Sequence, residues 1–160
     1  MIEKTNKDEF LDFLLDASNF KGDADKLYVP ESEEEIISLL RASNLTSEKI
    51  TVTGNGTGIT GSRVPLTGSI LSLLKFNKIV ECNEAEKWIR VQPALILADL
   101  QNFVESKSLF YPPDPTERNC FIGGTVATNA SGAKSFKYGA TRNYVIGLKV
   151  ILPCGEILDI

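Results

Sequence analysis

The sequence predicts an α+β fold with two subdomains, a small β-α-β layer over residues 27–74 and a larger antiparallel sheet with flanking helices from residue 79 onward. Apolar residues at helical spacing alternate with short apolar runs that glycine or proline bounds, a pattern typical of mixed folds. The chain has 160 residues, of which 42% are hydrophobic and 24% charged, as in a globular domain with a core of its own. Hairpin signals in the second half indicate antiparallel pairing.

Composition excludes several classes of function. No apolar run approaches the ~20 residues that span a bilayer, and Met1–Asp8 lacks the apolar core of a signal peptide. A net charge of −4 argues against a nucleic-acid partner. The three cysteines lack metal or redox spacing, which indicates reduced thiols in a cytoplasmic protein. The chain has no histidine, the commonest general base, and no metal site is predicted, so chemistry must come from a cofactor or from residues outside this chain.

The first elements follow from periodicity and capping. Phe10 and Leu14 lie on one face of a helix predicted over Thr5–Ser18. A short strand over residues 27–30 ends at a proline, and Ser32 then caps a second helix, with Glu35 in the capping-box position. The next strand covers residues 50–53, and a strand–helix–strand order favours a parallel pair.

The later elements have equally local signals. The apolar run over 69–74 predicts a buried strand, and Asn83–Glu86 reads as the turn between two paired strands. Pro93 ends the second of these strands, and apolar residues at helical spacing predict a third helix over 94–107. A last hairpin is predicted around Pro153–Gly155, with strands at 144–152 and 156–160.

The most informative stretch is the glycine loop, residues 53–62, which holds four glycines and four hydroxyl side chains directly after an apolar strand. Glycine backbones come close to a ligand, and successive N–H groups can form an anion cradle. The alternative is a flexible surface loop. The stretch Gly56–Gly61 also matches a dinucleotide fingerprint, but that motif requires a helix to follow, and Pro65 and Gly68 oppose one.

A second group of segments has similar chemistry. Tyr111–Thr116 contains three prolines, which form a rigid turn that positions its neighbours. The segment that follows, Ile122–Gly132, is again small, glycine-rich and hydroxyl-rich. By itself it is as consistent with a simple loop as with a binding segment. Two such segments in one small protein suggest a long, flat, polar ligand laid across both.

The ordered set of motifs resembles the FAD-binding half of the vanillyl-alcohol oxidase/PCMH flavoproteins, and is most similar to the branch that contains the FAD-binding chain of glycolate oxidase and the D-lactate dehydrogenases. The likeness covers roughly residues 25–160 and implies a PCMH-type FAD-binding fold. Its motifs are Val29-Pro30, Thr53–Gly58, Val91-Gln92-Pro93, Pro113-Asp114-Pro115, Gly123–Ala127, Asn129–Gly132, Tyr138-Gly139 and Leu152–Glu156.

The resemblance implies a role for each matching position. The glycine loop would wrap the FAD pyrophosphate, the proline turn would lie along the flavin and ribityl region, and the second glycine-rich segment would face the pyrophosphate and the flavin ring. Two further residues would lie on the adenine side. The implied contacts are Thr53, Gly54, Asn55, Gly56, Thr57, Gly58, Ile59, Gly61 and Ser62; Pro113, Asp114, Pro115 and Thr116; Gly123, Gly124, Thr128, Asn129, Ala130 and Ser131; and Gly139 and Val145.

The resemblance also sets the expected organisation. Residues 1–24 would be an N-terminal helical extension, and residues 25–160 a PCMH-type domain that is incomplete at its C-terminus, since family members continue with further strands and a substrate cap domain. Some members link FAD covalently through a histidine in the first loop. Thr57 occupies the nearest position here, so FAD would be noncovalent.

The implied function is the FAD-binding portion of a flavin-dependent oxidoreductase that oxidises a 2-hydroxy acid such as glycolate or D-lactate by hydride transfer to FAD. No catalytic base is predicted, and whether the chain is itself an enzyme stays open because the cap domain is absent. The alternative is an inactive fragment that acts as a binding or interaction module without tight FAD. An open sheet edge would then favour self-association.

Overall fold

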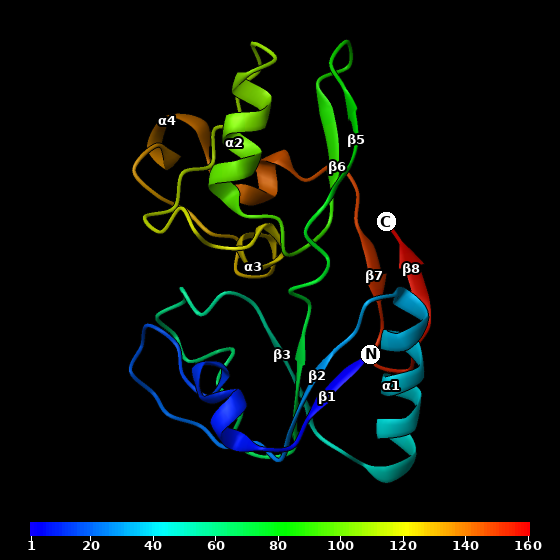
Figure 1. Ribbon diagram of the computed structural model, residues 1–160. Helices are drawn as coiled ribbons and strands as arrows, with labels where there is room; N and C mark the ends of the chain where they lie inside the picture. The colour runs from blue at the N-terminus through cyan, green and yellow to red at the C-terminus, as the bar shows by residue number, and fades with distance from the viewer. The chain divides into compact units, whose positions relative to one another are not determined.

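The computed structural model describes all 160 residues, which form two compact units. The first unit comprises Met1–Lys75 and Ile146–Ile160, and the second comprises Phe76–Val145. Helices and strands occur in both units (Figure 1), which confirms the α+β class. The last hairpin was expected in the second subdomain, but it belongs to the first unit.

A four-stranded sheet forms the centre of the first unit, in the order β1 (Ile2–Lys4), β2 (Lys26–Val29), β4 (Ser69–Ser72), β3 (Ile50–Thr53). Strand β1 is antiparallel to β2, and β4 is parallel to both of its neighbours. The prediction that β2 and β3 form a pair is wrong, because β4 lies between them. All four residues of β4 are buried, as suits a central strand.

The helix predicted over Thr5–Ser18 is wrong. Two short 3₁₀ helices, η1 (Lys7–Glu9) and η2 (Leu11–Phe13), occupy this segment. Phe10 separates them, and its φ of −141° lies far from a helical value. Phe10 and Leu14 nevertheless reach the core beside β2 and β4. The apolar spacing therefore identified the buried residues, while tertiary packing decided the backbone. The domain boundary at residue 25 stays a prediction.

Helix α1 (Glu33–Thr46) begins where the sequence predicts. The Ser32 hydroxyl accepts a hydrogen bond from the backbone N–H of Glu35 at 3.3 Å, which confirms the N-cap. The hairpin of β7 (Lys149–Ile151) and β8 (Ile157–Asp159) lies beside this helix (Figure 1). Asn44 Nδ2 donates to the carbonyl of Pro153 at 2.7 Å, so α1 holds the hairpin turn.

The second unit is built on a hairpin and a set of short helices. Strands β5 (Ile79–Asn83) and β6 (Trp88–Val91) pair antiparallel, and α2 (Leu97–Glu105), α3 (Ile122–Ala127), α4 (Ser135–Tyr138) and η3 (Thr141–Tyr144) follow. The expected larger antiparallel sheet is wrong, because each hairpin forms a separate two-stranded sheet. The buried core of this unit contains Leu95, Leu97, Leu100, Val104, Cys120 and Ile122.

Candidate functional site

The candidate residues fall into two groups, one in each unit. In the first unit, the glycine loop leaves β3 after the buried Thr53, and the chain next becomes regular at β4. Gly56 and Gly61 have φ values of +74° and +71°, which favour glycine. The loop thus joins strand to strand. This confirms that the dinucleotide fingerprint lacks the helix it requires.

Three carbonyl groups of the glycine loop accept hydrogen bonds from other groups of the first unit. Gly54 O accepts from Arg63 Nη1 at 2.8 Å, Gly56 O from the N–H of Ala17 at 3.0 Å, and Gly61 O from the N–H of Val64 at 3.0 Å. The backbone N–H groups of residues 56–60 donate to no backbone carbonyl within this unit. A Cβ built on Gly58 would meet no atom within 4 Å. The loop therefore presents unpaired donors beside open space, as an anion cradle does.

Arg63 is a functional candidate that the sequence analysis missed. Its guanidinium is half-buried and donates to three backbone carbonyls, those of Asp12, Leu15 and Gly54. Burial lowers the pKa of Arg63 from its ordinary value, and the carboxylates of Asp16 and Asp12 counteract this. The only local signal was a cation at the end of a glycine loop, because backbone acceptors leave no trace in the sequence.

Asp16 is a buried carboxylate behind the same loop. Its Oδ1 accepts hydrogen bonds from the backbone N–H of Ser18 at 2.9 Å and from the Ser18 hydroxyl. Burial by itself would raise the pKa of Asp16, but the Ser18 hydrogen bonds, the N–H of Gly61 and the charge of Arg63 together hold it below its ordinary value. Asp16 is therefore ionised at neutral pH and helps to fix the loop.

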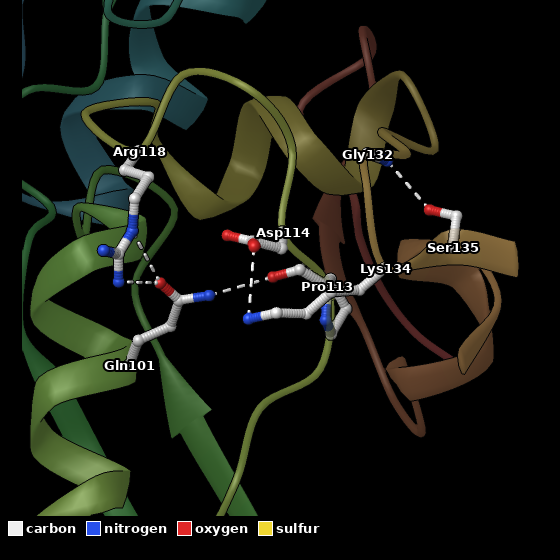
Figure 2. Close-up of polar contacts among 7 residues, drawn as sticks. All are labelled: Gln101, Pro113, Asp114, Arg118, Gly132, Lys134 and Ser135. Atoms are coloured by element: carbon white, nitrogen blue, oxygen red, sulfur yellow. Dashed lines mark hydrogen bonds and ion pairs between the residues drawn. The ribbon is translucent and has the colours of Figure 1, made fainter. Parts of the chain in front are cut away.

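In the second unit, the proline turn is held by a buried amide. Gln101 of α2 is 3% exposed, and its Nε2 donates to the carbonyl of Pro113 at 3.0 Å. Its Oε1 accepts from Arg118 Nη2 at 2.7 Å and from Arg118 Nε at 3.2 Å, as Figure 2 shows. The sequence analysis missed both Gln101 and Arg118. Together they fix the turn on helix α2.

The second glycine-rich segment meets the proline turn at Gly132. A Cβ on Gly132 would lie 1.8 Å from the carbonyl oxygen of Asp114, so only glycine fits here. Lys134 Nζ pairs with Asp114 Oδ2 at 3.1 Å, and the Ser135 hydroxyl accepts from the N–H of Gly132 at 2.8 Å (Figure 2). Two of the segments predicted to hold the cofactor are thus in contact within this unit.

The segment Ile122–Ala127 forms the short helix α3, where a loop was as plausible from sequence. Gly123 packs against Pro93, where its Cβ would lie 2.7 Å from the proline Cβ, and its N–H donates to Pro93 O at 2.7 Å. A Cβ on Gly124 would meet no atom within 4 Å. Gly123 therefore serves packing, while Gly124 faces open space.

The remaining predicted contacts fall into two groups, residues that pack within their own segment and residues that are at least partly exposed. Asn129 Oδ1 accepts from the N–H of Arg142 at 2.9 Å, and the carbonyl of Ala130 accepts from the Thr141 hydroxyl at 2.8 Å. Gly139 has a φ of +84°, and its Cβ would lie 2.1 Å from Asn143 Nδ2. These residues hold their own segment together. Pro115, Thr116, Thr128, Ser131 and Val145 lie on or near the same segments, at least partly exposed.

Two weak acids in the second unit, the partly buried Tyr111 and the buried Cys120, resist ionisation. Burial, with a smaller contribution from Cys120 and Tyr144, raises the pKa of Tyr111 to about 12. Burial and the carboxylate of Glu117 raise the pKa of the Cys120 thiol to about 11. Both groups are neutral at physiological pH, so neither acts as a base there. They belong to the core.

None of the helices combines the length and the hydropathy that a membrane-spanning helix requires. The fold resembles that of two solved enzymes. It matches alkyldihydroxyacetonephosphate synthase with a TM-score of 0.85 and 20% identity, over 99% of this chain and 35% of that one. It matches 6-hydroxy-D-nicotine oxidase from Arthrobacter nicotinovorans with a TM-score of 0.84 and 16% identity, over 97% of this chain and 34% of that one. These likenesses confirm the expected fold.

Sequence comparison agrees. The chain is 37% identical over 152 residues to a D-lactate dehydrogenase of Anaerostipes hadrus, covering 93% of this chain and 32% of the relative. It is 39% identical over 136 residues to the glycolate oxidase protein GlcD of Bacillus subtilis, covering 84% of this chain and 29% of the relative. The chain thus spans about a third of the length of these curated relatives.

The family model described as "FAD binding domain" matches residues 24–160, which is most of the chain. The match agrees with the structure of the glycine loop. The unpaired N–H groups of residues 56–60, beside the open space at Gly58, suit a cofactor that contains a pyrophosphate. The cofactor predicted from sequence, FAD, is thereby confirmed. This chain therefore belongs to the FAD-binding domain family.

Proposed function

We propose that this chain forms the FAD-binding part of a flavin-dependent oxidoreductase that oxidises a 2-hydroxy acid, such as glycolate or D-lactate. The observation that carries the cofactor assignment is the row of unpaired N–H groups over residues 56–60, beside the open face of Gly58. Relatives named D-lactate dehydrogenase, glycolate oxidase and D-2-hydroxyglutarate dehydrogenase support the substrate class.

The residues of this chain would bind and orient the cofactor. The N–H groups of the glycine loop would donate to the pyrophosphate oxygens, and the hydroxyls of Thr57 and Ser62 lie on the same exposed loop. The proline turn, fixed by Gln101, would line the flavin and ribityl region. Bound FAD supplies a two-electron acceptor for the hydride of the hydroxy acid. With no histidine in the chain, the binding would be noncovalent at the first loop.

The same proposal extends to location and partners. The cysteines Cys82, Cys120 and Cys154 are all free, which supports a reducing, cytoplasmic environment. Binding of a hydroxy-acid substrate would require residues other than the proposed cofactor contacts. Self-association through an open sheet edge would add a second copy of the chain as a partner.

The test is a visible absorption spectrum of the purified chain, followed by an FAD titration monitored by flavin fluorescence. Gly58→Ala is the informative variant, because its Cβ would touch no protein atom but would enter the proposed cofactor space. Gly147→Ala is the matched control, since its Cβ would meet only the carbonyl of Ile160, at 3.3 Å.

We expect saturable FAD binding by the parent chain and the control, and binding about tenfold weaker or worse in Gly58→Ala. The absence of a flavin spectrum and of saturation at about millimolar FAD would contradict the proposal. It would favour the alternative function, a binding module without tight FAD.

A further inference from the structure

Arg63 joins the glycine loop to a segment about 50 residues earlier in the chain. Its Nε and Nη2 donate to the carbonyl of Leu15 at 2.9 and 2.6 Å, and Nη2 also donates to Asp12 O. On the other side, Nη1 donates to Gly54 O at 2.8 Å. One planar group thus binds three backbone carbonyls from two distant segments, which the rigid donor fork of arginine permits.

The segment Asp12–Phe20 forms the inner side of the glycine loop. The N–H of Ala17 donates to Gly56 O at 3.0 Å, and a Cβ on Gly61 would lie 2.9 Å from Phe20 Cδ2. A Cβ on Gly56 would lie 2.7 Å from Arg63 Cζ, so the guanidinium packs directly under the loop. The segment therefore supports the loop at three points.

These contacts explain why the N–H groups of residues 56–60 are left unpaired. The carbonyls of Gly54 and Gly56 are both bound from the inner side, one by Arg63 and one by Ala17. With both carbonyls bound on the inner side, the N–H groups of residues 56–60 remain available to a ligand. Without this support, a loop with four glycines would sample many conformations, and binding a ligand would carry the cost of ordering it.

We propose that Arg63 is a positioning residue for FAD. By linking the glycine loop to the segment Asp12–Phe20, Arg63 would hold the loop in the conformation in which its N–H groups are available to the cofactor. The proposal rests on the proposed function of this loop as the pyrophosphate site. It makes the N-terminal segment, which precedes the family match at residue 24, a part of the cofactor site. Arg63 would act through the backbone carbonyls that it binds, those of Asp12, Leu15 and Gly54.

The test compares Arg63→Lys and Arg63→Gln with Arg41→Lys in the 160-residue chain. Arg41 is a matched control in the same unit. Its Nη2 donates to one backbone carbonyl, that of Gly155, at 3.4 Å, and neither residue belongs to the glycine loop. Lysine keeps the charge but loses the fork, and glutamine keeps a planar donor but loses the charge. Two readouts are needed: FAD affinity by flavin fluorescence, and hydrogen exchange of the Ala17 amide without FAD.

We expect both Arg63 variants to bind FAD about tenfold more weakly than the parent, since neither side chain has the donor fork that binds all three carbonyls at once. Without FAD, the Ala17 amide should exchange about tenfold faster, while amides of β4 keep their protection. Arg41→Lys should change neither readout. The exchange measurement does not need FAD, so it separates this proposal from the proposed function.

Three results would overturn the proposal. The first is an unchanged FAD affinity in both Arg63 variants. The second is unchanged Ala17 exchange, which would show that the loop conformation does not depend on Arg63. The third is global unfolding of both variants while Arg41→Lys stays folded, because Arg63 would then support the whole unit rather than the loop. Failure of the parent chain to bind FAD would contradict the proposed function instead. Hydrogen exchange of the Ala17 amide would still test whether Arg63 holds the glycine loop against Asp12–Phe20.

Discussion

Gly132 lies directly against the carbonyl oxygen of Asp114, at a distance where a Cβ on Gly132 would be only 1.8 Å from that oxygen. The contact joins the second glycine-rich segment to the proline turn. Real Cβ atoms do not approach an oxygen this closely, and the other atom is backbone, which cannot rotate away. The glycine at this position is therefore required for the two segments to meet.

Gly132→Ala should lower the free energy of unfolding by about 1–3 kcal/mol, as overpacking does in other proteins. Urea unfolding monitored by circular dichroism measures it. Gly124→Ala is the control within the same unit, because its Cβ would meet no atom and a helical alanine is favoured over glycine by roughly 0.5–1 kcal/mol. Equal stability of Gly132→Ala and the parent would show that the segments do not pack as described.

Gly124→Ala should also weaken FAD binding. Since Gly124 lies in α3 and faces open space, the variant should be at least as stable as the parent chain. It should nevertheless bind FAD about tenfold more weakly, because the added methyl group would occupy cofactor space. Flavin fluorescence titration measures the affinity. Unchanged affinity would remove Gly124 from the proposed contacts.

Gln101→Leu should destabilise the second unit. The substitution keeps the approximate size of the side chain but removes the donor to Pro113 O and the acceptor for Arg118. Leaving a buried carbonyl unpaired costs about 1–3 kcal/mol, and urea unfolding should show a loss of that order. Asn102→Leu, at the exposed neighbouring position of the same helix, is the control and should stay within about 0.5 kcal/mol of the parent.

Asp16→Asn should show a pH-dependent loss of stability. Burial by itself would raise the pKa of Asp16, but the Ser18 hydrogen bonds, the N–H of Gly61 and the charge of Arg63 together hold this pKa below its ordinary value of 3.8. Its ionised form therefore stabilises the fold above pH 3.8, and this contribution is lost as the pH falls through the lower native pKa. The variant should be less stable than the parent by on the order of 1 kcal/mol at neutral pH.

Urea unfolding at several pH values checks this, with Asp25→Asn in the same unit as the control. The difference between Asp16→Asn and the parent should shrink in strong acid, where the Asp16 carboxylate is protonated in both states. A difference that does not change with pH would mean that the charge of Asp16 contributes nothing.

Cys120 should make the chain less stable in alkali. Burial raises the pKa of its thiol from 9.0 to about 11, so the unfolded chain ionises first. The stabilisation is complete below pH 9.0 and is lost as the pH rises toward about 11. Relative to the parent, Cys120→Ala should lose less stability between about pH 8 and about pH 11, by on the order of 1 kcal/mol. Parallel pH profiles of the two proteins by urea unfolding would contradict this.

Local signals in the sequence were sufficient for several elements. The N-cap at Ser32, the β5–β6 hairpin and the strand-to-strand path of the glycine loop all depend on residues close together in the chain. The same signals misled at Thr5–Ser18, where helical spacing placed Phe10 and Leu14 correctly in the core but could not show that Phe10 interrupts the helix. They also could not show that β4 lies between β2 and β3.

The sequence by itself determined the α+β class, the glycine loop and the resemblance to FAD-binding domains, because glycine, proline and capping residues act over a few neighbours. Only the tertiary structure identified Arg63 and Gln101 as the residues that hold the candidate segments in place. Their partners are the backbone carbonyls of Leu15 and Pro113, and every residue carries such a carbonyl. A backbone acceptor has no sequence signature, so the fold alone reveals which side chain binds it.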